Sequence, residues 1–262
     1  ENGMQGLRVV PVWAEFQPLK HLKGWRQEPK SLRIGEMPIP DDAFGRAGIS
    51  PLMMERFQLL ADEAEKNGLN LIVSLLGCWL SGRLYIPPAF ENLNTLADPF
   101  VINWQVKFVK TFVEHFKMHE AIVAWELGNE CNCMDAADRE SAAHWTSSIA
   151  NAIKAADSSR PVLSGMHNLQ LFNGSWRIED QADSCDALTV HPYTIFTEHC
   201  DNDSVDSIRN GLHAAAEASL YSDVGAKPCL MEEFNSLAPL SCDNEVSARY
   251  ARTALFSAFA HD

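Results

Sequence analysis

Apolar runs of strand length alternate along the chain with segments whose apolar residues recur at a helical spacing. The six runs are GLRVVPVW (6–13), LNLIVSLL (69–76), AIVAWEL (121–127), PVLSG (161–165), DALTVHPY (186–193) and KPCLMEEF (227–234). Helical patterns cover 50–68, a segment opening at Asp98-Pro99, 136–156, 205–220 and 244–261. The proline-rich stretch 14–49 reads as an irregular loop, and the segment between the fourth and fifth runs has room for a short helix.

This alternation predicts a parallel sheet covered by helices. No dinucleotide fingerprint or phosphate loop follows any of the apolar runs, which counts against a doubly wound nucleotide-binding fold. Polar residues instead gather where three of the runs end, namely Asn129, Glu130, His191, Tyr193, Glu232 and Glu233. Because functional residues collect at the carboxyl ends of the strands in an eight-stranded βα barrel, we expect an α/β fold of the (β/α)8 TIM-barrel type, forming a single catalytic domain over residues 1–262.

Two of these strand ends carry carboxylates about a hundred residues apart. Glycoside cleavage requires two carboxyl groups that flank the scissile bond, one as a proton donor and one as a nucleophile or base. A lone glutamate at a strand end is more often an ordinary surface carboxylate. The joint pattern, with Arg8 in the first run and His191-Pro192-Tyr193 between the two acids, favours a glycosidase.

With these motifs in order, the chain resembles glycoside hydrolase family 5 or a near neighbour in the same clan of retaining barrel hydrolases. WELGNE is similar to the clan's fourth barrel strand, where Asn129 would hold the sugar 2-hydroxyl and Glu130 would be the acid/base. MEEFN is similar to the seventh strand, which makes Glu233 the nucleophile. The resemblance implies a retaining enzyme that cleaves β-linked gluco- or manno-configured glycans without a metal or organic cofactor. Glu130, facing the charge of Glu233, is then expected to have a raised pKa.

The same resemblance gives supporting roles to other residues. VHPY is similar to the sixth strand and places His191 and Tyr193 near the nucleophile, while Arg8 matches an arginine that supports it. Since adjacent strand residues point to opposite faces, Glu232 is expected to turn away from the barrel mouth. Glu126, inside its strand, is expected to be a structural partner of a buried cation.

The chain also departs from the family pattern. Gly77 and Cys78 stand where the third barrel strand often ends in a histidine, and the neighbouring Trp79, like Trp13, is a candidate sugar-stacking surface. His167, Trp25 and Trp176 are loop candidates of lower rank. The six runs correspond to barrel strands two to seven, so the first and eighth strands are missing, and we expect these residues to be part of a longer polypeptide. A six-stranded open fold is the alternative.

The net charge limits the classes of binding partner, and the cysteine content bears on the cellular compartment. The formal net charge of −14 disfavours nucleic acid and anionic membranes as partners and suits a neutral or cationic substrate. Seven cysteines, an odd number, favour reduced thiols and a cytoplasmic setting. Cys131-x-Cys133 could begin a zinc site with His199, Cys200 or Cys242, although its spacing is unusual for zinc and buried, inert thiols fit better.

Two other functions compete with a retaining glycosidase. The first is a non-catalytic sugar-binding relative that has kept the cleft. The second is a metal-dependent barrel hydrolase, which would require His-x-His on an early strand, and none of the nine histidines is so arranged.

Overall fold

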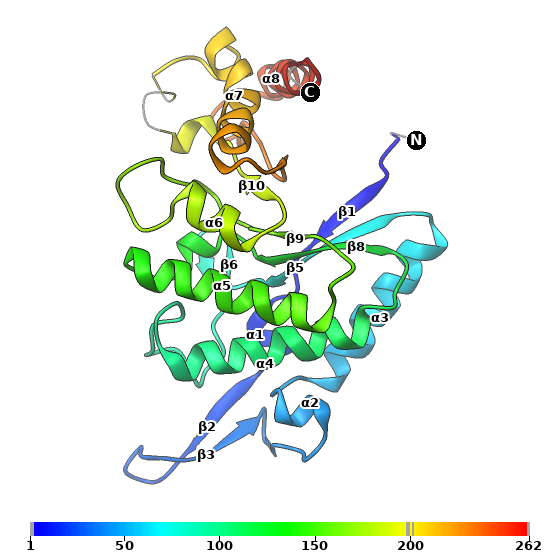
Figure 1. Ribbon diagram of the computed structural model, residues 1–262, viewed down its shortest axis with the longest axis vertical. Helices are drawn as coiled ribbons and strands as arrows, with labels where there is room; N and C mark the ends of the chain where they lie inside the picture. Colours follow the sequence, from blue (N-terminus) through cyan, green and yellow to red (C-terminus); the bar gives the residue numbers. More distant parts are fainter. Residues whose placement is uncertain (1–2, 198–199, 201, 261–262) are drawn as a thin grey trace.

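Six short parallel strands form the framework of the computed structural model, which describes residues 3–197, 200 and 202–260 (Figure 1). They are β1 (Gly6–Val9), β5 (Asn70–Leu76), β8 (Ile122–Gly128), β9 (Val162–Leu163), β10 (Leu188–Val190) and β11 (Cys229–Met231). The pairing order is β1-β5-β8-β9 in one sheet and β10-β11 in another, and a parallel bridge from Leu163 to Ala187 connects the two. Each strand therefore lies beside its predecessor in the chain, and the expected TIM-barrel fold is confirmed for strands two to seven.

Helices follow the strands and cover their outer side. They are α3 (Pro51–Lys66), α4 (Pro99–Phe116), α5 (Arg139–Ala156), α6 (Ile178–Ser184), α7 (Ile208–Gly225) and α8 (Asn244–Phe259). Figure 1 shows α4 and α5 side by side against the four-stranded sheet, with α7 and α8 together at the opposite end of the molecule from a hairpin of β2 (Leu19–Lys23) and β3 (Pro29–Ile34). The short α6 lies in the segment where the sequence left room for a helix.

Side-chain caps mark the starts of several helices. The carboxylate of Asp98 accepts a hydrogen bond from Phe100 N at 2.8 Å, as its position before Pro99 predicted. Two other helices begin later than their apolar patterns suggested. The carboxylate of Asp138 accepts from Ser141 N at 2.8 Å and the hydroxyl of Ser207 accepts from Asn210 N at 3.2 Å, so α5 starts at residue 139 and α7 at residue 208. Residue 261, the predicted end of the last helix, lies outside the described residues.

An aromatic cluster holds the helices to the sheet. Phe57, Phe112 and Phe116 pack edge to face or tilted, with ring centroids 4.9 Å apart, and Phe112 contacts Trp125 of β8 at 6.4 Å. All four side chains are buried. Trp125 Nε1 also donates to Asp157 Oδ2 at 2.8 Å, so its polar atom is satisfied inside the core. This packing fixes β8, the strand that leads to Glu130.

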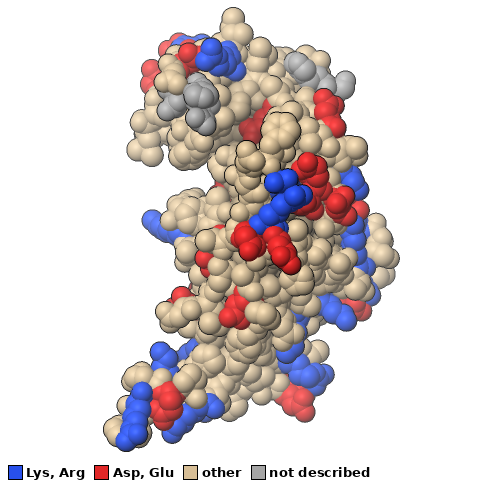
Figure 2. Space-filling model, turned by 60° about the vertical axis from the view of Figure 1, so that its left-hand side comes forward, with Lys and Arg blue, Asp and Glu red and all other residues tan. Residues whose placement is uncertain are grey.

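The stretch 14–49 is not an irregular loop, and this prediction was wrong. It folds into α1 (Trp13–Phe16), an antiparallel sheet of β2 (Leu19–Lys23), β3 (Pro29–Ile34) and β4 (Met37–Pro38), and α2 (Ala43–Arg46). The hairpin extends from the body, so its tip is exposed while its base packs on the core, where Leu19 is fully buried. Burial therefore changes along the strands and the alternation that marks a half-buried strand is weak (Figure 1). Basic side chains gather at this end of the molecule in Figure 2, and Trp25 at the hairpin tip is 82 % exposed.

The sheet remains open between its first and last strands. Among the described strands, β1 pairs only with β5 and β11 pairs only with β10. A cavity of about 300 Å³ lies between these two edges, and its lining includes Leu7 and Arg8 on one side and Leu230 and Glu232 on the other. Leu7 and Leu230 are 43 % and 39 % exposed, respectively. These edges are where the sequence predicted the neighbouring first and eighth strands.

Two global features complete the fold. Within the described ranges, no helix combines the length and the apolar character required to cross a membrane. None of the seven cysteines, all of which lie in the described part of the chain, forms a disulfide.

Candidate active site

The expected polar residues meet at the carboxyl ends of β8, β10 and β11. Glu130 follows β8 in the left-handed conformation, with φ 46° and ψ 50°, which is uncommon for a residue that carries a side chain. Such backbone strain is maintained where the surrounding structure requires a defined side-chain direction, and it concentrates at functional sites. Gly128 allows the close approach of β8 to β5 just before this turn, since a Cβ there would lie 2.4 Å from Leu76 O.

The His191 imidazole connects the two predicted catalytic carboxylates. Its Nδ1 lies 3.0 Å from Glu130 Oε1 and 3.3 Å from Glu233 Oε1. The sum of these two distances is therefore the upper limit of the separation between Glu130 Oε1 and Glu233 Oε1. The His191 side chain is fully buried, whereas the side chain of Glu233 is 33 % exposed and can face a ligand.

Tyr193 and Arg8 hold the other side of Glu233, as the sequence predicted. The hydroxyl of Tyr193 donates to Glu233 Oε2 at 3.2 Å, and Nη1 of Arg8 lies 3.5 Å from Oε1. The pKa of Tyr193 is raised, because its hydroxyl is buried and lies next to the Glu233 carboxylate. Tyr193 therefore stays protonated and remains a hydrogen-bond donor to Glu233.

Arg8 makes its shortest contacts with Glu126, which confirms the expectation that Glu126 pairs with a buried cation. Nε and Nη2 of Arg8 donate to the two Glu126 oxygens at 2.8 and 2.5 Å, and Ser74 Oγ donates to Glu126 Oε1 at 2.9 Å. Burial and the neighbouring Glu232 nonetheless raise the pKa of Glu126 to about 7, against the opposing effect of Arg8. Arg8 therefore contacts Glu233 while it remains paired with Glu126.

Glu232 is buried, but strand alternation does not separate it from Glu233, because both carboxylates lie within 3.6 Å of Arg8 and His191 and both line one cavity. Its side chain is fully buried, 3.5 Å from His191 Nε2 and 3.6 Å from Arg8 Nε. Neither of its carboxylate oxygens makes a hydrogen bond within the described part of the chain. Glu232 is thus a second carboxyl group beside His191, more buried than Glu233.

The pKa expected for Glu130 is corrected by the structure. Burial works to raise it, but the His167 and His191 imidazoles outweigh burial and lower the pKa of Glu130 to about 2. The pKa of His191 moves the other way. Burial opposes the change, but Glu130, Glu232 and Glu233 together raise the pKa of His191 to about 9. The resting site therefore carries its proton on the imidazole and not on Glu130. The sequence-based expectation failed because the sequence did not reveal that two histidines surround this carboxylate.

Three substrate-contact predictions have different outcomes. Asn129 is almost fully buried and its Nδ2 donates to Trp79 O at 2.8 Å, so part of its hydrogen-bonding capacity is already used. Trp79 is half-buried beside it in the two-residue strand β6 (Trp79–Leu80). The prediction that Trp13 contacts the substrate was wrong. It lies in α1 instead of ending a strand, is fully buried, stacks on Phe90 at 5.7 Å and donates to Gln17.

His167 and Phe196 join the site more directly than the sequence indicated. Nδ1 of His167 lies 3.0 Å from Glu130 Oε1, and its backbone N–H donates to Asn132 Oδ1 at 2.9 Å. Phe196, which sequence reasoning missed, is 60 % exposed and packs 6.1 Å from the His167 ring and 5.8 Å from the Tyr193 ring. Its position three residues after Tyr193, in the loop that follows β10, could have indicated that Phe196 lies near the site.

The remaining tryptophans are structural or distant. Trp104, Trp145 and Trp176 are buried, and Trp145 packs on Trp176 at 6.2 Å. Trp176 is therefore a core residue and not a loop aromatic open to substrate.

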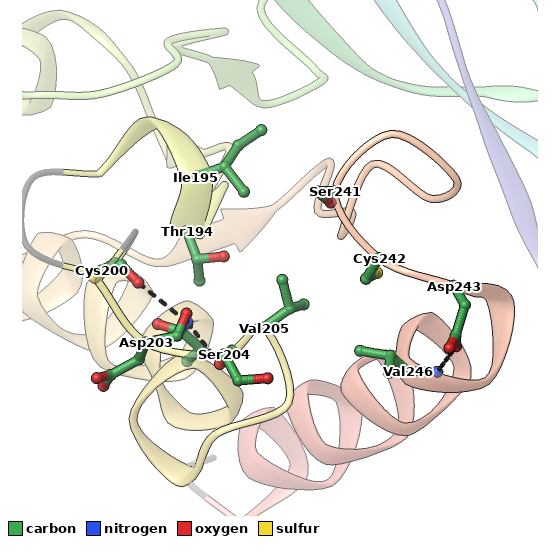
Figure 3. Close-up of a pocket in the computed structure, with 11 residues that line it drawn as sticks. Thr194, Ile195, Cys200, Asp203, Ser204, Val205, Ser241, Cys242, Asp243 and Val246 are labelled. Atoms are coloured by element: carbon green, nitrogen blue, oxygen red, sulfur yellow. Dashed lines mark hydrogen bonds between the residues drawn. The ribbon is translucent and has the colours of Figure 1, made fainter.

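An open cavity of about 460 Å³ lies against Glu233. Its lining residues are Arg8, Tyr193, Met231, Glu232, Glu233, Phe234 and Asn235. A second cavity of about 410 Å³ lies near α7 and α8 (Figure 3), and many of its polar groups already serve local structure. Asp243 caps α8 by accepting from Val246 N, and Asn210 donates to Cys200 O. The cavity at Glu233 is therefore the candidate for substrate.

A zinc site around Cys131 and Cys133, which the sequence left open but did not favour, does not assemble from the residues described. Cys131 is fully buried, and burial raises its pKa well above the ordinary value. Cys133 is half-buried, and burial raises its pKa to about 11. His199 lies outside the described residues. Among those described, the cluster whose geometry could hold a metal consists of Glu130, His167 and His191.

The family model of the "Glycosyl hydrolases family 2, TIM barrel domain" matches residues 60–235, more than half of the chain. The chain belongs to this family. The TIM-barrel domain of this family agrees with the resemblance to glycoside hydrolase family 5 or a near neighbour in the same clan, and that prediction is confirmed.

Curated relatives match a large part of this chain at low identity. The mannan endo-1,4-β-mannosidase A of Hypocrea jecorina is 25 % identical over 197 residues, which are 70 % of this chain and 44 % of that protein. A probable mannan endo-1,4-β-mannosidase F of Aspergillus flavus is 26 % identical over 80 % of this chain and 47 % of its own length. The chain thus spans about half the length of the curated relatives it matches.

A GH5_18 structure from Streptomyces cattleya in complex with GlcNAc has a TM-score of 0.80 at 20 % identity, covering 98 % of this chain and 59 % of that one. The exo-β-1,4-mannosidase of Opitutaceae bacterium strain TAV5 has a TM-score of 0.73 at 21 % identity, covering 99 % and 44 %, respectively. At these identities, the structural likeness shows the shared TIM-barrel fold.

Proposed function

We propose that this domain is the catalytic part of a retaining β-glycosidase that acts on manno-configured, β-linked glycans. The observation that carries the proposal is the shared contact of Glu130 and Glu233 with Nδ1 of His191. Retaining glycosidases place their two carboxyl groups about 5–5.5 Å apart, whereas inverting enzymes leave about 6.5–9.5 Å for a water molecule. Two carboxylates bound to one nitrogen favour the shorter, retaining separation.

Glu233 is the nucleophile in this proposal. It is partly exposed, follows β11 and receives hydrogen-bonding and charge support from Tyr193 and Arg8. Its ionised oxygen attacks the anomeric carbon and forms a glycosyl ester as the bond to the leaving oxygen breaks. Glu130 then assists a water molecule, which hydrolyses the ester with retention of configuration.

The leaving oxygen requires a proton that Glu130 does not hold at rest. His191 supplies it in our mechanism, since its Nδ1 lies 3.0 Å from Glu130 Oε1 and its pKa is raised to about 9. Glu130 and His191 together hold one proton between pH values of about 2 and about 9. As negative charge develops on the leaving oxygen, Glu130 passes on this proton and recovers it when water attacks.

The sugar class rests on the relatives. The two curated relatives named above carry mannan endo-1,4-β-mannosidase names, and a GH5_18 variant from Streptomyces cattleya was solved in complex with Manβ1-4GlcNAc. The acidic surface is compatible with such neutral sugars. A gluco-configured substrate is the second arm of the test.

Covalent trapping tests the proposal. The protein is incubated with 2-deoxy-2-fluoro-mannosyl fluoride or with the glucosyl reagent, and its peptides are analysed by mass spectrometry. We expect a mannosyl adduct on the peptide that contains Glu233, its absence in Glu233→Gln, and its retention in the adjacent control Glu232→Gln. An adduct on another carboxylate would overturn the assignment of the nucleophile.

A combined result would favour the sugar-binding alternative. If neither reagent forms an adduct and β-1,4-manno-oligosaccharides bind without turnover, the glycosidase proposal fails. If only the glucosyl reagent reacts, the mechanism holds and the manno-configured substrate is wrong.

A further inference from the structure

One side of the site has the donor set of a metal centre. Glu130 Oε1 lies 3.0 Å from Nδ1 of His167 and 3.0 Å from Nδ1 of His191, and the three donor atoms all lie within 4.8 Å of one another. Two imidazoles and one carboxylate form a known three-ligand set for zinc with an open fourth position. In a tetrahedral site with bonds of roughly 2.0–2.1 Å, donor atoms are separated by roughly 3.3–3.4 Å. Small side-chain adjustments would reach this spacing.

Hydrogen bonds to the backbone fix the position of His167. His167 follows a turn at Gly165, where φ is +66° and a Cβ would come 2.0 Å from Gly128 O. The next two residues are fixed by side-chain acceptors, since Met166 N donates to Thr189 Oγ1 at 3.0 Å and His167 N donates to Asn132 Oδ1 at 2.9 Å. The donor set therefore rests on ordered backbone from three different strand ends.

The state of His167 is the second observation. Its Nδ1 is buried and, although it lies near Glu130, it makes no hydrogen bond of good geometry to any described residue. Its side chain is only 14 % exposed. A buried nitrogen next to a carboxylate oxygen, without a well-formed hydrogen bond, is in the position that a shared cation would satisfy.

The surrounding charge also attracts a cation. Four carboxyl groups, those of Glu126, Glu130, Glu232 and Glu233, surround two cationic side chains, Arg8 and His191. The net negative charge lowers the free energy of a divalent ion there, because the site is largely shielded from water. Imidazole and carboxylate donors without a thiolate suit zinc and neighbouring transition metals.

We propose that Glu130, His167 and His191 bind one zinc-class divalent cation, which reversibly blocks the site. The binding itself does not depend on the proposed function. Its consequence, inhibition, does rest on that function, because the cation would occupy the acid/base Glu130 and the imidazole that holds the proton.

A proton is released when the cation binds. His191 is surrounded by Arg8, Glu130, His167, Glu232 and Glu233. Because a metal ion displaces protons from imidazole and carboxylate ligands, the affinity should fall as the solution is made acidic.

Isothermal titration calorimetry with zinc chloride is the first test. We expect one site in the wild type, binding at least about tenfold weaker in His167→Gln, and unchanged binding in the control His144→Gln. His144 is exposed on α5 and is not part of the cluster. Equal binding by the wild type and His167→Gln, or no binding by the wild type, would overturn the proposal.

Cobalt(II) gives a measurement that does not depend on a variant folding. Bound to this nitrogen and oxygen set, cobalt should show visible ligand-field bands without the near-ultraviolet charge-transfer band of thiolate ligands. A thiolate band that accounts for all bound cobalt would place the metal on cysteines and refute the site. Because these experiments measure binding directly, a negative fluorosugar result leaves their outcome intact, and a negative metal result leaves the glycosidase proposal intact.

Discussion

Replacing Arg8 with methionine would test how the buried charges of the site are balanced. Arg8 donates to both oxygens of Glu126, at 2.8 and 2.5 Å, and lies within 3.6 Å of Glu232 and Glu233. Methionine is of similar length and removes the charge without opening a large cavity. The change leaves the fully buried Glu126 without its cation.

The size of the effect follows from burial and the pKa of Glu126. Removing one partner of a buried ion pair costs about 3–5 kcal/mol. In the wild type, the raised pKa of about 7 means that folded Glu126 is largely protonated below pH 7, whereas the unfolded chain ionises near 4.5. Without Arg8, this pKa rises further, so folded Glu126 stays neutral above pH 7. The loss of stability should then grow by up to about 1.4 kcal/mol per pH unit above pH 7, while it changes little between pH 5 and pH 7.

Urea unfolding followed by tryptophan fluorescence at pH 6, 7, 8 and 8.5 would measure this profile. The matched control introduces Arg8→Met into a Glu126→Gln background, where the amide cannot titrate and the pH dependence above 7 should disappear. A loss below about 1 kcal/mol at pH 8, or a loss that shrinks as pH rises, would refute the reasoning.

Three further predictions concern single side chains. Trp13→Ala should lower the free energy of unfolding by about 3–5 kcal/mol and leave KM for a mannoside unchanged, because Trp13 is fully buried. Urea unfolding and steady-state kinetics would measure both quantities. An unchanged stability with a raised KM would show that Trp13 contacts the substrate after all. Phe196→Ala should raise KM several-fold and change the unfolding free energy by less than about 0.5 kcal/mol, since Phe196 is 60 % exposed beside Tyr193; wild-type kinetics would exclude it as a sugar platform. The raised pKa of His191, about 9 against an ordinary 6.5, should stabilise the fold by about 3 kcal/mol. This contribution should be fully present below pH 6.5 and should be lost as the pH rises to 9. Urea midpoints with the same pH profile in His191→Gln would contradict this prediction.

Much of the fold could be predicted from periodicity because it depends on local patterns. Strand-length apolar runs located all six parallel strands, and Asp98-Pro99 marked one helix start. Boundaries were less accurate where a cap outside the apolar pattern decides the start, as Asp138 does for α5. The hairpin of β2 and β3 was missed, since burial changes along its strands and leaves no strong alternation.

The candidate site was predictable as a set of residues and less so as an electrostatic arrangement. Glu130, Glu233, His191 and Tyr193 follow strands, so their meeting at one end of a parallel sheet follows from topology. The resting charge of Glu130 did not follow, because it depends on a second imidazole, His167, that reaches it from another loop.

The sequence by itself determined the order of the six parallel strands and of the long helices between them, the fold class and the carboxylates at the strand ends, because these depend on periodicity and on where each strand stops. Only the tertiary structure decided which groups share a proton or a cation. Arg8 is 118 residues from its main partner, Glu126, and His191 lies 61 residues from Glu130. Electrostatic interactions depend on distance and burial in the folded chain, and separation along the sequence reports neither.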